Sequence, residues 1–153
     1  YEPYLSVTIT KKVVGDMGDT TKNFSFTATL DTTQIRQGSA YTTAGDGAAL
    51  TDTGFTLRSG GSVTLNHLRA DQTLTLTETD PGDHTVSWQL NGDDGPTGAT
   101  CTIQVPRAQP AEITCINTRN VGIPTGLHTG AAPYLALVGL CWLGWRLLRC
   151  REV

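Results

Sequence analysis

Apolar and polar residues alternate along much of the chain between residues 4 and 118, which is the pattern of β-strands that bury one face. Clusters of Gly, Asp, Asn and Pro separate the alternating runs and predict turns. The pattern predicts an all-β domain, an antiparallel immunoglobulin-like sandwich of about seven or eight strands. The expected strands cover residues 4–14, 23–30, 55–57, 62–65, 72–79, 84–90, 100–105 and 112–118.

The segments between these strands differ in character. Ser59-Gly60-Gly61 joins two short apolar runs and predicts a hairpin. Residues 31–54 are polar with weak periodicity, so we expect a long connection that holds at most a short helix or strand. Residues 91–97 are rich in Gly and Asp and predict a loop.

Three polar residues break the apolar faces of the predicted strands. Lys11 shares a face with Val7 and Ile9, and Glu78 lies in phase with two leucines of its own strand. Asn117 lies in phase with the apolar residues of the last strand. A lone buried Lys or Glu is costly, so we expect the three side chains to meet. A register shift of one residue would place Lys12 inside instead of Lys11.

Chemistry offers a way to neutralise these buried charges. Burial favours the uncharged forms of Lys11 and Glu78, and an uncharged lysine amine can attack the side-chain carbonyl of Asn117. Glu78 would carry protons while ammonia leaves, and an amide would join the first strand to the last. The reaction happens once per chain, so the chain is expected not to be an enzyme. The alternative is that Lys11 extends its amine toward solvent and forms a plain ion pair with Glu78, while Asn117 caps a turn.

The two cysteines of the β region, Cys101 and Cys115, lie in phase on strands joined by a short turn. If these strands pair as a hairpin, the two residues face each other and can form a disulfide. The alternative is two buried thiols that fill core space. The three histidines show no metal-binding spacing, and no motif for a cofactor is present.

The chain changes character after residue 120. The formal net charge is −3, with an acidic body that offers no footprint for nucleic acid. We expect a β domain over 1–120, a linker over 121–130, a transmembrane helix over 131–148 and a basic cytoplasmic tail over 149–153. A buried core helix is the alternative for the apolar run. The chain begins at Tyr1 without an export signal, so we expect it to be the C-terminal piece of a longer precursor.

Three motifs resemble one known family. Residues 10–16 and 19–26 (TKKVVGD and DTTKNFSF) resemble the opening of the CnaB-like (Cna protein B-type) domains of Gram-positive surface proteins and pilins. Leu74-Thr75-Leu76-Thr77-Glu78-Thr79 is similar to their E-box, and Ile116-Asn117-Thr118-Arg119 to their closing strand. The resemblance implies a CnaB-like sandwich with an autocatalytic isopeptide bond between Lys11 and Asn117, in which Glu78 shuttles the proton.

The linker resembles a cell-wall sorting signal. Ile123-Pro124-Thr125-Gly126 precedes the apolar run and the basic end, in the order of an LPXTG-type signal but without the residue between Pro and Thr. The resemblance implies that a sortase-type transpeptidase cuts after Thr125 and joins the chain to peptidoglycan or a pilin subunit. Otherwise the helix itself is a permanent membrane anchor.

These observations predict a structural stalk domain at the cell surface. Its body would be extracellular, and N-terminal modules beyond this chain could carry a host or extracellular ligand. The alternative function is an adhesin-type binding module in which residues 31–54 or the 91–97 loop contact the ligand. Tyr41 is the aromatic residue that these two segments offer for such a contact.

Overall fold

The computed structural model describes residues 3–35, 41–45 and 47–121. Contacts divide the chain into two units, Tyr1–Asn120 and Val121–Val153, and the first contains nearly all of the described residues. The predicted sorting motif, transmembrane helix and basic tail lie outside the described residues. Within the described ranges, no helix is long and apolar enough to cross a membrane.

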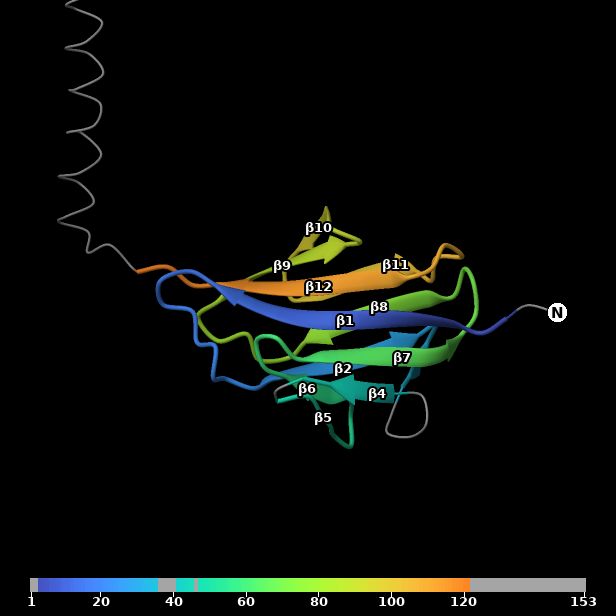
Figure 1. Ribbon diagram of the computed structural model, residues 1–153, viewed down its shortest axis with the longest axis horizontal. Helices are drawn as coiled ribbons and strands as arrows, with labels where there is room; N and C mark the ends of the chain where they lie inside the picture. The colour runs from blue at the N-terminus through green and yellow to red at the C-terminus, as the bar shows by residue number, and fades with distance from the viewer. Residues whose placement is uncertain (1–2, 36–40, 46, 122–153) are drawn as a thin grey trace, which may run out of the picture. The chain divides into compact units, whose positions relative to one another are not determined.

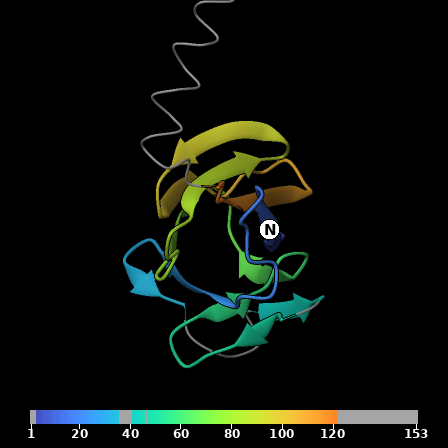
Figure 2. The ribbon, with the colours of Figure 1, turned by 90° about the vertical axis from the view of Figure 1, so that its left-hand side faces the viewer.

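The first unit is a sandwich of two β-sheets, so the predicted all-β sandwich is confirmed. The expected seven or eight strands were too few, because the described residues form twelve. Figure 1 shows β12, β1 and β7 running side by side, and Figure 2 shows the strands end-on around the space that the core side chains fill. The first sheet has the order β10 (Asp93–Thr97), β9 (Thr85–Leu90), β12 (Ala111–Thr118), β1 (Leu5–Val14), β7 (Ser62–Leu68) and β4 (Tyr41–Ala44). The second has the order β11 (Thr100–Gln104), β8 (Thr73–Glu78), β2 (Phe24–Leu30), β6 (Phe55–Leu57) and β5 (Ala49–Leu50), with β3 (Thr33–Gln34) also paired to β2.

The first and last strands of the sandwich are direct neighbours. β1 lies between β7, which runs antiparallel to it, and β12, which runs parallel to it from Val7↔Ala111 to Val14↔Thr118. The prediction of a wholly antiparallel sandwich was therefore wrong at this pair. Alternation sets which face a side chain takes, but not the direction of the neighbouring strand.

The predicted hairpin around Ser59-Gly60-Gly61 was also wrong. β6 pairs with β2 and β5 in one sheet, whereas β7 pairs with β1 and β4 in the other. The connecting segment crosses between the sheets and fastens itself to β1: the Lys11 amide donates to Gly61 O, and the Gly60 amide donates to Lys11 O, both at 2.9 Å. Gly60 has a φ of +89°, a conformation that glycine adopts without strain.

The two segments predicted as connections contain strands. Residues 31–54 include β3, β4 and β5, and the predicted 91–97 loop is mostly strand β10. Asn91 and Gly92 form the turn between β9 and β10, with φ values of +48° and +88°. This Asn-Gly pair is a strong hairpin signal, and the sequence interpretation missed it because the strand beyond it is exposed throughout and has no alternating apolar residues.

Aromatic and aliphatic side chains fill the space between the sheets. Phe26 and Phe55 stack with ring centroids 5.2 Å apart, and Trp88 packs edge-on against Phe26 at 6.3 Å. The Trp88 indole donates a 2.8 Å hydrogen bond to Gly98 O, which satisfies its polar atom inside the core. Most of the buried residues in the described part of the chain are apolar, and four of them are polar or charged: Lys11, Glu78, His84 and Asn117.

Candidate functional site

Lys11, Glu78 and Asn117 meet inside the sandwich, as the strand phases predicted. Their exposed fractions are 0%, 1% and 0%, and they come from β1, β8 and β12. Glu78 lies on the opposite sheet from the other two, so its side chain reaches across the core to both. Lys12 is exposed, which excludes the one-residue register shift.

One carboxylate oxygen connects the other two groups. Glu78 Oε1 accepts a 2.8 Å hydrogen bond from Asn117 Nδ2 and lies 3.4 Å from Lys11 Nζ. Asn117 therefore does not cap a turn, and Lys11 does not extend to solvent. The alternative of a plain ion pair therefore agrees with the structure only in the contact between Lys11 and Glu78.

The surroundings of Lys11 favour its uncharged form. The amine is enclosed by apolar rings, 4.5 Å from the centroid of Phe24 and 5.9 Å from that of Phe26, which take the place of water although their faces also attract an ammonium group. Burial lowers the pKa of Lys11 below its ordinary value, against the opposing effects of Cys115 and Glu78. An amine with a lowered pKa more readily presents the lone pair that a nucleophile needs.

Cys115 completes the group, and the structure places it where the sequence interpretation did not. It lies directly opposite Lys11 in the β1–β12 ladder, and Lys11 Nζ lies 3.5 Å from its Sγ. We call Lys11, Glu78, Cys115 and Asn117 together the polar pocket. The signal that could have found Cys115 was its position two residues before Asn117, on the same face of the strand.

The expected ladder pair of Cys101 and Cys115 was wrong. β11 pairs with β8, so Cys101 faces Leu76, whereas β12 belongs to the other sheet and Cys115 pairs with Lys11 and Trp88. Both cysteines are free and buried thiols, which is the alternative that the sequence left open. Phase alone cannot tell whether two strands joined by a turn belong to one sheet.

A buried histidine, His84, packs against Phe24, the ring that lies beside Lys11. The ring of His84 packs edge-on against Phe24 with centroids 5.3 Å apart. Its Nε2 accepts a 3.4 Å hydrogen bond from the Asp19 amide, and Nδ1 lies 3.0 Å from Pro81 O. These contacts assign the proton to Nδ1 and hold the ring that positions Phe24 beside Lys11.

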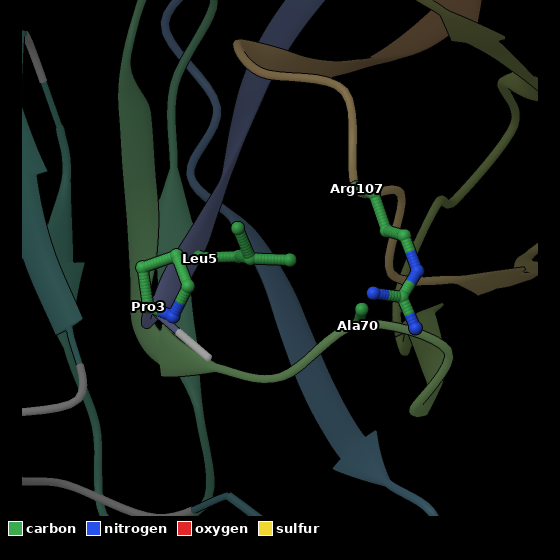
Figure 3. Close-up of a pocket in the computed structure, with 4 residues that line it drawn as sticks. All are labelled: Pro3, Leu5, Ala70 and Arg107. Atoms are coloured by element: carbon green, nitrogen blue, oxygen red, sulfur yellow. The ribbon is translucent and has the colours of Figure 1, made fainter. Parts of the chain in front are cut away.

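Other candidate features lie away from the polar pocket. A pocket of about 110 Å³ near the start of β1 is lined by Pro3, Leu5, Ala70 and Arg107, whose side chains are drawn in Figure 3. Arg107 forms an ion pair with Asp71 at 3.0 Å. Among the described residues, no cluster of three or more His, Cys, Asp or Glu side chains could hold a metal ion.

The aromatic side chain in the segments considered for a binding module, Tyr41, is turned inward. Tyr41 is buried at 7% exposure, and its hydroxyl donates a 2.6 Å hydrogen bond to Ile35 O. Burial raises the pKa of Tyr41 to about 12. Its ring contributes to the core beside Phe55 and is not a surface for a ligand.

The structure is a two-sheet β-sandwich in which a lysine of β1, a glutamate of β8 and an asparagine of β12 are buried together. The chain belongs to the family described as a domain of unknown function, DUF7601, which matches residues 5–119.

Comparison with known proteins places this fold among pilins and adhesins. The chain is 27% identical over 150 residues to a pilin of Streptococcus pyogenes serotype M1, covering 86% of this chain and 44% of the pilin. It resembles the structure of the major pilin of Streptococcus pyogenes, with a TM-score of 0.56 and 20% identity over 76% of this chain and 48% of the pilin. The chain thus spans less than half the length of these proteins.

A second structural relative comes from another genus. An adhesin of Mobiluncus mulieris gives a TM-score of 0.55 and 16% identity over 76% of this chain and 41% of the adhesin. That adhesin contains intramolecular disulfide, isopeptide and ester bond cross-links. At these identities the structural likeness establishes the fold, and the chemistry of this chain depends on its own residues.

Proposed function

We propose that this domain is a structural stalk segment of a Gram-positive surface or pilus protein, of the CnaB-like type, locked by an isopeptide bond between Lys11 and Asn117. It is a structural domain and not an enzyme that turns over a substrate. The observation that carries the proposal is the contact of Glu78 Oε1 with both reacting nitrogens, 3.4 Å from Lys11 Nζ and 2.8 Å from Asn117 Nδ2.

The polar pocket contains every group that the proposed reaction needs. The uncharged Lys11 amine attacks Asn117 Cγ, and a bond forms between Nζ and Cγ. Glu78 accepts a proton from Nζ and delivers a proton to Nδ2, and the bond between Cγ and Nδ2 breaks with release of ammonia. The product is an uncharged amide, so the former lysine can no longer carry a charge that is costly to bury. Glu78 gives up one proton for each that it accepts and ends in the state in which it began.

The fold performs most of the catalysis by holding the reactants together. The chain brings Lys11 and Asn117 into one buried pocket, and fixed reactants of this kind react as if at very high concentration. Exclusion of water keeps the amine uncharged and removes the competing hydrolysis of the amide. The bond would form only in the folded domain and only once.

The position of the bond determines how the domain would carry a load. β1 and β12 are parallel neighbours, so a pull on the two chain ends shears one strand along the other. A bond from Lys11 to Asn117 would carry that force directly between the two strands. The residues between them would lie outside the load path, and the sandwich could not be unzipped.

Intact mass of the full 153-residue chain tests the cross-link. We expect the wild-type chain to be lighter than its sequence by one ammonia molecule, and the Asn117→Ala chain to have its full mass. Asn120→Ala, which changes an exposed asparagine on the same segment, is the matched control and should retain the loss. A wild-type chain of full mass would contradict the proposed bond.

We further propose that Ile123-Pro124-Thr125-Gly126 joins the domain to peptidoglycan or to a pilin subunit through a sortase-type transpeptidase. The support is the order of this motif, the apolar run and the arginine-rich end in the sequence. In a Gram-positive host, wild-type protein should be released by digestion of the cell wall. Thr125→Ala should move it to the membrane fraction. If both proteins stay in the membrane fraction, the apolar segment is a permanent anchor instead.

A further inference from the structure

Cys115 contacts both reacting side chains and the proton carrier. It is fully buried, and its Sγ lies 3.5 Å from Lys11 Nζ, 3.8 Å from Asn117 Oδ1 and 3.9 Å from Glu78 Oε2. These are hydrogen-bonding distances for sulfur, with the thiol hydrogen able to point at either oxygen. A side chain that only filled space would not need three polar neighbours.

The two ends of the Asn117 amide face different groups. Its nitrogen, which leaves as ammonia, donates to Glu78 Oε1. Its oxygen lies against the Cys115 thiol, which is the hydrogen-bond contact that the described residues give Oδ1. Glu78 thus serves the leaving nitrogen, whereas the thiol lies beside the oxygen on which charge develops.

We propose that Cys115 is a further catalytic residue of the cross-linking reaction, and that its S–H group donates to Asn117 Oδ1 as the tetrahedral oxyanion forms. The inference rests on the proposed isopeptide reaction. Attack of Lys11 on Cγ moves an electron pair onto Oδ1, and a donor within reach of that atom stabilises the transition state more than the ground state. When the intermediate collapses, the electron pair returns to re-form the carbonyl, and the thiol keeps its proton.

The state of the thiol agrees with a donor and not with a nucleophile. Burial raises the pKa of Cys115 to about 12, while the adjacent Lys11 acts in the opposite direction. The thiol therefore keeps its hydrogen at the pH of a cell surface. A route in which a Cys115 thiolate attacks Asn117 and forms a thioester would need the form that this environment disfavours.

Cys101 provides a matched comparison in the same core. It is also a fully buried thiol, but it lies on β11, where its ladder partner is Leu76. Replacing either cysteine by alanine removes one sulfur atom from a buried site, so the packing cost should be similar. Cys101 is close enough to Cys115 to contribute to its raised pKa, but Cys101 has no hydrogen bond to Lys11, Glu78 or Asn117 among the described contacts. The difference between the two variants therefore measures what the direct contacts of the Cys115 thiol add.

The test follows the rate of ammonia loss in the full chain. A short pulse of cell-free synthesis is stopped, samples are quenched in denaturant at intervals, and intact mass gives the cross-linked fraction. Removal of one oxyanion donor slows a reaction by up to two or three orders of magnitude, and for a weak thiol donor we expect about tenfold with Cys115→Ala. Cys115→Ser keeps a donor and should react about as fast as wild type. Cys101→Ala should also match wild type.

Cys115→Val separates the missing donor from a missing volume, because it fills the site without an S–H group. Slow reaction of both the alanine and valine variants, with rescue by serine, supports the inference. Equal rates for wild type and all three Cys115 variants would overturn it and leave the proposed cross-link intact. A wild-type chain that never loses ammonia would instead overturn the proposed function itself.

Discussion

Strands β1, β8 and β12 contribute to two different regions of the core. Toward one end of the sandwich they contribute only apolar side chains, Val7 and Ile9 from β1, Leu74 and Leu76 from β8, and Ile113 from β12. We call these five residues the apolar region. Two residues further along each strand, the inward positions become Lys11, Glu78 and Cys115, and Asn117 follows.

The comparison shows two ways of using buried volume. The apolar region stabilises the fold as soon as it is buried, because it removes hydrocarbon surface from water. The polar pocket is unfavourable at first, since charged groups lose their hydration there. In the proposed reaction, an uncharged amide would replace the Lys11 amine and lower this cost. The apolar region therefore acts as the scaffold that forces the reactants of the polar pocket together.

The largest effect should come from removing the proton carrier. Glu78→Ala should abolish the ammonia loss. The free energy of unfolding should then fall by about 4–5 kcal/mol, which is the contribution of a cross-link that closes a loop of about 100 residues. The substitution also leaves Lys11 buried without its partner, which costs a further ~3–5 kcal/mol. Chemical denaturation and intact mass measure the two effects. Glu112→Ala, at an exposed position of β12, should change neither.

A substitution in the apolar region should separate stability from chemistry. Leu76→Ala, two residues before Glu78 on the same strand, should lower the free energy of unfolding by about 2–5 kcal/mol through a cavity. The cross-link should nevertheless form to completion, since the polar pocket is unchanged. Complete absence of ammonia loss in this variant would show that the two regions are not separable.

A smaller effect is the pH dependence of the chain that cannot react. In Asn117→Ala, Lys11 stays free with a lowered pKa, so below its ordinary value of 10.5 the folded chain binds fewer protons at this residue than the unfolded chain. The Lys11 contribution to stability should therefore improve as pH rises from about 7 toward 10.5. Burial of the Cys115 thiol acts in the opposite sense above its ordinary pKa of 9.0.

The Lys11 contribution is isolated by a second variant. Asn117→Ala combined with Lys11→Met keeps the cysteine and removes the amine. The difference in melting temperature between the two variants should shrink from about pH 7 to about pH 9.5. A constant difference over this range would contradict a lowered lysine pKa.

The smallest effect is expected one residue from the reacting lysine. Lys12→Ala, on the exposed face of β1, should change the free energy of unfolding by no more than about 0.5 kcal/mol and should leave the ammonia loss complete. Thermal melts and intact mass would show it. Loss of the cross-link in this variant would mean that the amine comes from Lys12.

The alternation of residue types was sufficient to predict most of the strands and the face that each side chain takes. A period of two residues is a local property of an extended backbone, so the pattern alone assigns Lys11, Glu78 and Asn117 to the core. The cost of burying such groups singly predicted that they would be found together.

The identity of neighbouring strands, in contrast, follows only from the folded sandwich. Strand pairing depends on contacts between distant parts of the chain, and the alternating pattern is the same for either sheet and either direction. The sequence therefore could not show that β12 runs parallel to β1, that β6 and β7 belong to different sheets, or that Cys115 faces Lys11 and not Cys101. The neighbours of a buried thiol decide what it can do: Cys101 pairs with Leu76, whereas Cys115 lies beside the Asn117 amide, to which it would donate in the proposed reaction.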